Sequence, residues 1–344
     1  MFHKSSVSPH AMTPQPAQPL LRIASRRSLL ARAQTRLFLE RLYSQQPHMQ
    51  GRCTVTTMRS TLSPSMPKAR FTKTLNDAVI AHSIDCAVHS LKDMPARLEP
   101  PLVIACFLPR EDASDALLMA PPMHARLKGT IPRLRDIRPF FPPSTPIRLG
   151  TSSLRRKAQL QHVLPHSTIL PITGNIDSRL RHLTGQGEPI DGIILATAGL
   201  KRLRMDHHIT LPIAKDDMLP AAGQGILAVV CRHDDKDTRC LLAPLNDEES
   251  SLCAQTEFAV LRGVGASCHA PIGVHATITR QHKERAMLCV RAFLGDETGA
   301  LSWQLDGTCP ATLSDGQRLG HHIGTQLRQT AGKTFAQRYL QDIT

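Results

Sequence analysis

The stretch from Leu149 to Gln161 combines a tight turn with hydroxyl and guanidinium groups, a pattern typical of an anion-binding site. Gly150 permits a sharp turn, after which the unpaired amides of a following helix point at one spot where anions bind. Three hydroxyl residues are placed to cap that helix: Thr151, Ser152 and Ser153. Arg155 and Arg156 add guanidinium groups suited to carboxylate or phosphate. The alternative is a capped helix with a solvated basic face.

A lysine and an aspartate, Lys92 and Asp93, come just after an expected strand over residues 85–89. Loops at the ends of strands carry the ligand-binding groups of α/β sheets. Asp93 can therefore donate a proton or stabilise a developing cation, and the alternative is a surface ion pair with its neighbour.

Six arginines lie at or near expected junctions of strand and helix: Arg22, Arg26, Arg155, Arg156, Arg179 and Arg202. Such a set is what a ligand with several carboxylates needs, although scattered arginines also solvate helices. Cys268 lies in a loop of small residues, 265–271, where an accessible thiol can act as a nucleophile. A loop cysteine without a role is the alternative.

The composition favours a small acidic ligand. The 344 residues carry a formal net charge of +14, which predicts an acidic partner, but aromatic residues make up only 3% and argue against a nucleic-acid binder. Nine cysteines, none in a C-x-x-C pair, predict reduced thiols, with no disulfide framework and no metal site. No apolar run is long enough to span a membrane, so no membrane contact is expected.

Strand and helix patterns alternate, which predicts an α/β fold with three domains. Residues 20–110 with 225–243 are expected to form domain 1, and residues 111–224 form domain 2 with an irregular, Pro-rich insertion at 119–146. Residues 247–344 form a small α+β domain with an antiparallel sheet. Residues 1–20 read as a disordered or targeting tail. Two α/β domains side by side would flank a ligand-binding cleft.

The start of domain 1 is expected to be a strand followed by a helix capped by Ser28. Its apolar face is predicted to carry Leu30, Ala33 and Leu37.

Eight motifs in order resemble those of the porphobilinogen deaminase family. They are residues 22–26, 85–95, 110–116, 150–156, 174–179, 194–202 and 219–225, and the Cys268 loop with the following Pro-Ile-Gly. The resemblance covers nearly everything from residue 20 onward except the Pro-rich insertion.

The resemblance implies two domains like periplasmic binding proteins and a third that carries a cysteine on a loop. It implies hydroxymethylbilane synthesis: four porphobilinogen molecules are condensed head to tail, with loss of ammonia, on a dipyrromethane cofactor bound to Cys268 through a thioether. Asp93 would be the catalytic residue. The other implied cofactor-binding residues are Lys92, Ser90, Thr151, Ser152, Ser153, Arg155, Arg156, Gly174, Arg179 and Gln224. The implied substrate-binding residues are Arg22, Arg26, Phe71, Arg179 and Arg202.

Three departures from the family pattern leave a second hypothesis open. Thr173 stands where the family usually has arginine, the segment 57–71 is shortened, and Ala266-Ser267 replaces the usual Gly-Gly. The alternative is therefore a divergent, weakly active or non-catalytic member that binds an anionic ligand between its domains. The resemblance favours a monomer. No nucleic-acid partner is expected, because no nucleic-acid-binding module is visible in the sequence. A cytoplasmic location is expected. The alternative is a mitochondrion or plastid, because no acidic residue precedes Glu40, as is typical of a transit peptide.

Overall fold

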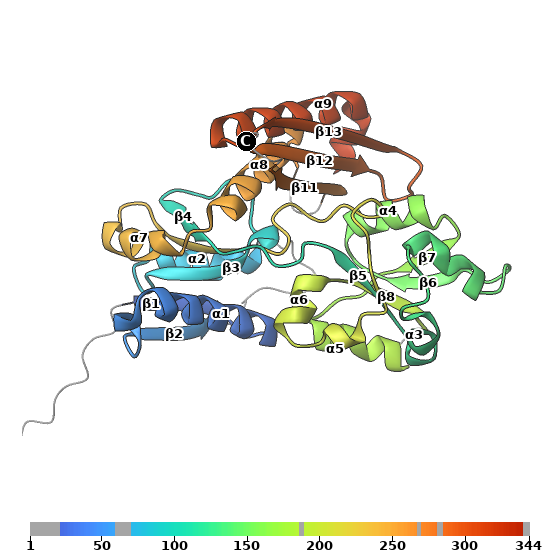
Figure 1. The fold of residues 1–344 in the computed structure, drawn as a ribbon, viewed down its shortest axis with the longest axis horizontal. Coiled ribbons are helices and arrows are strands. Elements are labelled where there is room, and N and C mark those ends of the chain that lie inside the picture. The colour runs from blue at the N-terminus through green and yellow to red at the C-terminus, as the bar shows by residue number, and fades with distance from the viewer. Residues whose placement is uncertain (1–20, 59–69, 186–188, 267–269, 281–284, 340–344) are drawn as a thin grey trace, which may run out of the picture.

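The computed structural model describes residues 21–58, 70–185, 189–266, 270–280 and 285–339. It is a mixed α/β structure built on three sheets (Figure 1). Within the described residues, no helix is long and apolar enough to cross a membrane.

The first sheet has five strands and mixes parallel with antiparallel pairing. Its order is β2 (Cys53–Met58), β1 (Leu21–Arg26), β3 (Cys86–Ser90), β10 (Leu227–Arg232) and β4 (Leu102–Phe107). β1 runs parallel to β2 and β3, whereas β10 runs antiparallel to β3 and β4. The chain therefore returns to the first sheet at β10, after the second sheet.

The second sheet repeats the plan of the first. Its order is β7 (Ser167–Leu170), β6 (Ile147–Gly150), β8 (Gly192–Ala196), β5 (Asp115–Met119) and β9 (Leu211–Pro212). β6 is parallel to β7 and β8, and β5 is the antiparallel strand. In each sheet the antiparallel strand is the one the chain enters after crossing from the other sheet. The sequence shows no internal repeat that corresponds to this structural repeat.

The third sheet is antiparallel and belongs to the C-terminal part of the chain, as expected. It consists of β11 (Ile272–Thr279), β12 (Met287–Gly295) and β13 (Ser302–Pro310). Two long helices pack on it, α8 (Glu248–Val264) and α9 (Leu313–Tyr339), the second kinked at Gly332. Figure 1 shows this unit above the other two sheets. Its core is continuous with that of the first sheet, because Phe258 and Ile272 cluster with Ala87 and Val230.

The remaining helices flank the first two sheets. Those of the first are α1 (Leu29–Gln45), α2 (Arg70–Ile80) and α7 (Lys236–Leu242); those of the second are α3 (Pro121–Leu127), α4 (Leu154–Val163), α5 (Ile176–Arg181) and α6 (Thr197–Arg202). Short 3-10 turns are η1 (Pro47–Met49), η2 (Leu91–Asp93), η3 (Leu134–Phe140), η4 (His182–Thr184), η5 (Asp206–His208) and η6 (Ala243–Leu245).

The two crossing segments between the sheets lie side by side. The amide of Glu111 donates to the carbonyl of Gly225 over 3.1 Å. Gly225 has a φ of 92°, and a Cβ there would collide with the carbonyl oxygen of Glu111. Only glycine fits this close backbone approach, which explains why the second crossing segment needs it.

Two expectations about local structure are wrong. Ser28 does cap α1, since its side chain accepts from the amide of Ala31, but the buried face carries Gln34, Thr35, Phe38 and Leu42, and Leu37 is 40% exposed. The segment 119–146 is also not an irregular insertion. It contains α3, with Pro121 at its start, and η3, and it buries Leu127, Leu134 and Ile137 in the core of the second sheet.

Candidate active site

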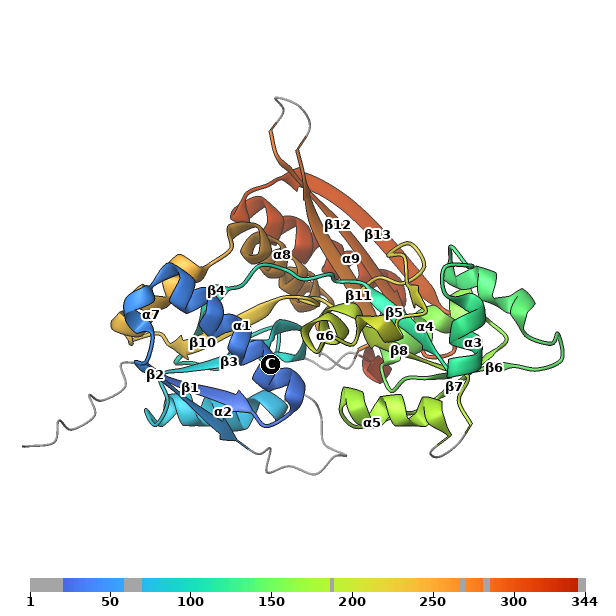
Figure 2. The ribbon, with the colours of Figure 1, turned by 60° about the horizontal axis from the view of Figure 1, so that its bottom comes forward.

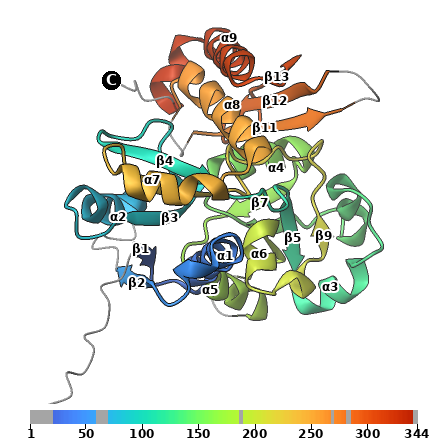
Figure 3. The same cartoon turned by 60° about the vertical axis from the view of Figure 1, so that its left-hand side comes forward.

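Groups from both α/β units meet where the parallel strands end. Arg26 ends β1 and Asp93 follows β3, whereas Arg179 lies in α5 after β7. Burial and the charge of Arg156 lower the pKa of Arg179, and the charge of Asp93 opposes them. Asp93 and Arg179 are therefore within electrostatic reach although they belong to different sheets. The same two units touch through α1 and α6, which lie next to each other in two views (Figures 2 and 3).

Asp93 is held by a short turn with buried anchors on both sides. Leu91 is fully buried and Met94 is 2% exposed, so the turn η2 is fixed in the core while Asp93 stays half-buried. The amide of Leu91 donates to the carbonyl of Ile226 over 3.0 Å. Gln34 of α1 donates to the hydroxyl of Ser90 over 2.8 Å. The carboxylate is thus presented from a rigid support, as a positioned acid or base requires.

His89 is a buried histidine beside this carboxylate that the sequence reasoning did not single out. It is 4% exposed, and its Nε2 atom is buried without a hydrogen-bond partner in the described part of the chain. Burial and the charge of Arg26 lower the pKa of His89 to about 4, while the charge of Asp93 opposes them. The imidazole is therefore neutral at neutral pH. The charges of Arg26 and Asp93 both act on His89, so the two groups lie in the same electrostatic environment.

The lowered pKa of His89 predicts a specific pH dependence of stability. The unfolded chain takes up a proton near pH 6.5, whereas the folded chain does so only near pH 4, so stability falls as the pH drops through that window. We expect wild type to lose about 2 kcal/mol more than His89→Asn between pH 7.5 and 5, measured by urea denaturation. His82→Asn, at an exposed histidine, is the control and should keep the wild-type slope. Equal slopes for His89→Asn and wild type would contradict the prediction.

Gln224 connects Lys92 to the second sheet. It is fully buried; its Oε1 accepts from Lys92 Nζ over 3.3 Å, and its Nε2 donates to Asp115 over 2.9 Å and to the carbonyl of Ala113 over 2.7 Å. Lys92 belongs to the turn that carries Asp93, and Asp115 begins β5. The predicted residue Gln224 therefore lies at the junction of the two sheets.

Arg155 and Arg156 are buried and share one carboxylate, that of Asp115. Arg155 donates to Asp115 over 2.7 Å and Arg156 over 2.8 Å, and all three residues are at most 5% exposed. Burial alone would raise the pKa of Asp115, but the two guanidinium charges outweigh it and hold that pKa well below its usual value. The arginines also donate to the carbonyls of Leu219 and Ile194. These hydrogen bonds fix both guanidinium groups within the protein. The predicted pair is therefore not free to reach out and bind a ligand.

Asp115 is a second site residue that sequence reasoning missed, besides His89. It stands inside the motif 110–116, so a signal was present, but its acidic side chain gave no hint that it would pair with two arginines some 40 residues away. The trio keeps one net positive charge beneath the site.

The three hydroxyl residues before α4 are expected to cap that helix together, but their contacts differ. Ser153 is the N-cap residue, but its side chain makes no capping hydrogen bond. The hydroxyl of Thr151 accepts from the amide of Ser153 over 3.2 Å. The hydroxyl of Ser152 donates to the carbonyl of Ile172 over 2.6 Å, which ties the turn to the end of β7 instead of the helix.

Arg22 is not brought to the site. It lies at the opposite end of β1 from Arg26, and its Nη2 donates to Asp85 over 2.6 Å. Four residue steps along the strand separate the two arginines by about 13 Å, which explains the difference. Arg202 is half-buried and donates to the carbonyl of Gly225 over 2.6 Å; burial lowers its pKa to about 10, against the charge of Glu111. Its visible contact is with the crossing segment.

The remaining predicted residues are placed as follows. Gly174 has a φ of 95°, and its carbonyl accepts from Arg179 Nε over 2.9 Å. Phe71 lies in the first turn of α2. Cys268 lies outside the described residues, so its role stays a prediction. Among the described cysteines, Cys86, Cys106 and Cys231 are buried, whereas Cys289 is half-buried.

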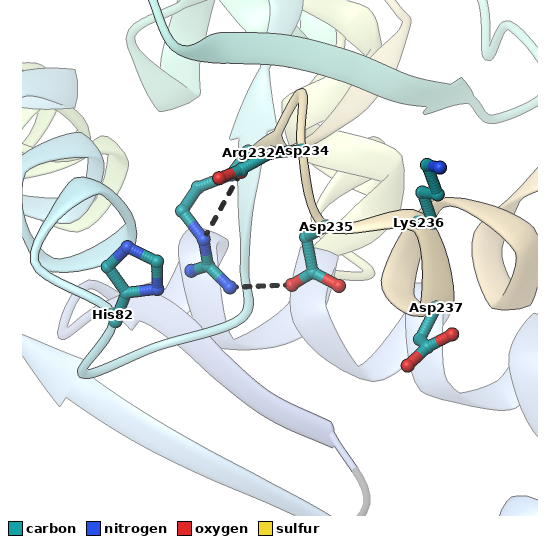
Figure 4. A pocket seen from close by; sticks show the side chains of 6 residues that line it. All are labelled: His82, Arg232, Asp234, Asp235, Lys236 and Asp237. Atoms are coloured by element: carbon teal, nitrogen blue, oxygen red, sulfur yellow. Dashed lines mark hydrogen bonds and ion pairs between the residues drawn. The ribbon is translucent and has the colours of Figure 1, made fainter.

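A surface depression of about 440 Å³ lies around Arg232, at the end of the first sheet's strands that is opposite Asp93 (Figure 4). The guanidinium of Arg232 donates to the carbonyls of Val79 and Ile84 and to Asp235 over 2.6 Å. These bonds hold the end of α2 to the start of β3. The depression is the surface of a structural ion pair, far along the strands from Asp93.

Two kinds of sequence comparison identify relatives of this chain. A family model described as "Porphobilinogen deaminase, dipyromethane cofactor binding domain" matches residues 21–240. The chain belongs to the porphobilinogen deaminase family. A porphobilinogen deaminase of Sorangium cellulosum is 34% identical over 90% of this chain and 98% of that protein. One of Roseiflexus is 35% identical over 91% and 97%, and a chloroplastic one of Pisum sativum is 31% identical over 96% and 87%.

The described residues fit the dipyrromethane cofactor of this family. That group carries several carboxylates, and the strand ends present Arg26, Arg179 and Lys92 above the net positive charge of the Asp115 trio. Among the described residues there is no group of histidine, cysteine and acidic side chains arranged to hold a metal ion.

Proposed function

We propose that this chain is a hydroxymethylbilane synthase of the porphobilinogen deaminase family. It condenses four porphobilinogen molecules head to tail with loss of ammonia and releases hydroxymethylbilane. The observation that carries this function is the family match across residues 21–240, which includes every strand of both α/β units and the Asp93 turn. The dipyrromethane cofactor supplies the covalent primer from which the chain of pyrroles grows.

The chain's own residues bind and orient anionic pyrroles. Each porphobilinogen carries an acetate and a propionate, and we assign Arg26 and Arg179 as their partners from the two facing sheets. A guanidinium holds a carboxylate through two parallel hydrogen bonds, which fixes orientation as well as affinity. Arg155 and Arg156 contribute to binding through their positive charge alone, because their guanidinium groups are hydrogen-bonded to Asp115. Lys92, together with Gln224, holds the turn against the second sheet.

Asp93 works on the leaving amine. Its fixed carboxylate lies beside positive groups from both sheets, so a substrate with bound carboxylates brings its aminomethyl nitrogen to the acidic group between them. There the carboxylate holds a proton at that nitrogen and stabilises the positive charge that develops as ammonia leaves. This assignment is supported by the rigid turn around Asp93 and by its electrostatic coupling to Arg179.

Attachment of the cofactor is the direct test of the proposed function. Intact mass spectrometry of protein made in a host that supplies porphobilinogen should show a chain heavier by a dipyrromethane adduct. Cys268→Ala should lose the adduct entirely, because the thioether sulfur is gone. Cys240→Ala, at an exposed cysteine, is the matched control and should keep it. An unmodified wild-type mass would contradict the proposal.

We further propose that the protein is a monomer, in line with the family resemblance, to be checked by light scattering.

For the location of the protein in the cell we propose the cytoplasm. The alternative is an organelle, supported by the basic composition before Glu40 and by the chloroplastic pea relative. Amino-terminal sequencing of the protein from its own cells decides between them, since an organellar form would begin after the basic segment.

A further inference from the structure

An apolar groove of about 300 Å³ lies on the seam between the first sheet and the C-terminal unit. Its floor comes from the edge strand β4, with Val103, Ile104 and Phe107, and its opposite wall from α8, with Ala254 and Phe258. The segment that follows Asp93 closes one side with Pro95, Ala96 and Leu98. The groove is separate from the site described above, whose groups stand at the carboxyl ends of the parallel strands.

The charge in this groove is uncompensated. Arg262 of α8 lines it, together with the neutral side chains of Gln255 and Gln317, and no acidic residue of the described chain is among its lining residues. Burial and the charge of Arg97, another cation, lower the pKa of Arg262. Its Nη1 donates to the carbonyl of Ala96 over 3.3 Å. An apolar pocket with one convergent cation is the usual form of a site for a small organic acid.

We propose that this groove binds a small organic anion that has an apolar body and a single carboxylate, with the carboxylate on Arg262 and the body between β4 and α8. A negative group beside Arg262 relieves the repulsion from Arg97, and the body covers Ile104 and Phe258. The volume admits roughly ten non-hydrogen atoms, because a water molecule occupies about 30 Å³ of the liquid.

The position of the groove gives its occupant a way to act on the enzyme. One wall is the segment 95–98, directly after the Asp93 turn, and the other is α8, which leads into the loop of Cys268. A ligand that bridges these walls holds the C-terminal unit against the first sheet. Binding itself goes beyond the proposed function and does not depend on it.

Titration calorimetry with octanoate, which has ten non-hydrogen atoms, tests the proposal on the purified full chain. We expect one site with a dissociation constant on the order of 0.1 to 1 mM. Arg262→Gln should weaken binding at least tenfold, and Ile104→Trp, which fills the groove, should abolish it. Arg328→Gln is the matched control, because Arg328 also donates to a backbone carbonyl, that of Val264, but does not line the groove. It should bind as wild type does.

Further ligands and one further variant keep the test decisive if a groove variant does not fold. On wild type, octan-1-ol and octylammonium should each bind at least tenfold more weakly than octanoate, since they lack the anion. Arg179→Gln should leave octanoate binding unchanged, which separates the groove from the active-site arginines. The proposal is overturned if folded wild type gives no binding heat, if octan-1-ol binds as tightly as octanoate, or if Arg179→Gln and not Arg262→Gln removes binding.

Discussion

Replacing Asp93 by asparagine is expected to lower kcat by about a thousandfold while leaving the fold intact. The amide keeps the size of the side chain but can neither hold the proton nor balance the positive charge on the leaving amine, and positioned acid–base and electrostatic groups contribute about 10² to 10⁴ in rate. The side chain is half-buried between anchored neighbours, so stability should change little. Single-turnover release of ammonia from porphobilinogen is the measurement.

The chain offers a matched control for Asp93 on the same strand. Asp85 precedes β3 at its other end and pairs with Arg22, away from the site. Asp85→Asn should keep kcat within about twofold and lower stability by about 1 to 2 kcal/mol, because the side chains of Arg22 and Asp85 are only 41% and 15% exposed and the charge-assisted hydrogen bonds between them are weakened. Asp93→Glu should recover part of the rate, since it restores the charge with a misplaced carboxylate. A kcat for Asp93→Asn within threefold of wild type would refute the catalytic assignment.

Replacing Asp115 by asparagine is expected to reduce the free energy of unfolding by about 3 to 5 kcal/mol. The reason is the buried trio: without the carboxylate, Arg155 and Arg156 remain charged, side by side and out of water. Gln224 also loses its acceptor, so the link from Lys92 to the second sheet weakens. Urea denaturation followed by circular dichroism measures the loss.

Two further variants show whether the loss comes from uncompensated buried charge. Asp77→Asn removes the carboxylate of a surface pair with Lys73, whose side chains are about half-exposed, and should cost less than about 1 kcal/mol. Combining Asp115→Asn with Arg156→Met should recover part of the lost stability, because one of the two stranded charges is removed. Asp115→Asn with wild-type stability would show that the trio is not the support that its burial indicates.

Helix α1 has one feature that the sequence predicts, its cap, and one that it does not, its buried face. The serine cap was predictable because it depends on two residues three positions apart. The buried face was not, because Gln34 and Thr35 are buried for their partners: Gln34 donates to Ser90, and Thr35 to the hydroxyl of Ser25 over 2.7 Å. Apolar periodicity cannot identify polar residues whose burial depends on groups brought in by other strands.

The Pro-rich segment 119–146 shows a second limit of prediction from sequence, because a segment expected to be irregular is helical and packed. Its prolines indicated a loop, yet Pro121 begins α3, where its fixed φ suits the first helical turn. Leu127, Leu134 and Ile137 then complete the core beneath β5 and β6. Prolines identify where a helix cannot continue, but whether a segment packs depends on the surface that it meets.

The sequence by itself determined the α/β class, the small antiparallel C-terminal unit and the residues that follow several strands, because those properties depend on spacing along one stretch of chain. It also determined the family, through motifs such as residues 85–95 and 150–156. Only the tertiary structure decided what those residues face. It turned Arg155 and Arg156 inward onto Asp115, paired Arg22 with Asp85 and brought Asp93 within electrostatic reach of Arg179. The physical reason is that a charged side chain takes the partner that lies nearest in space, and distant parts of the chain supply that partner.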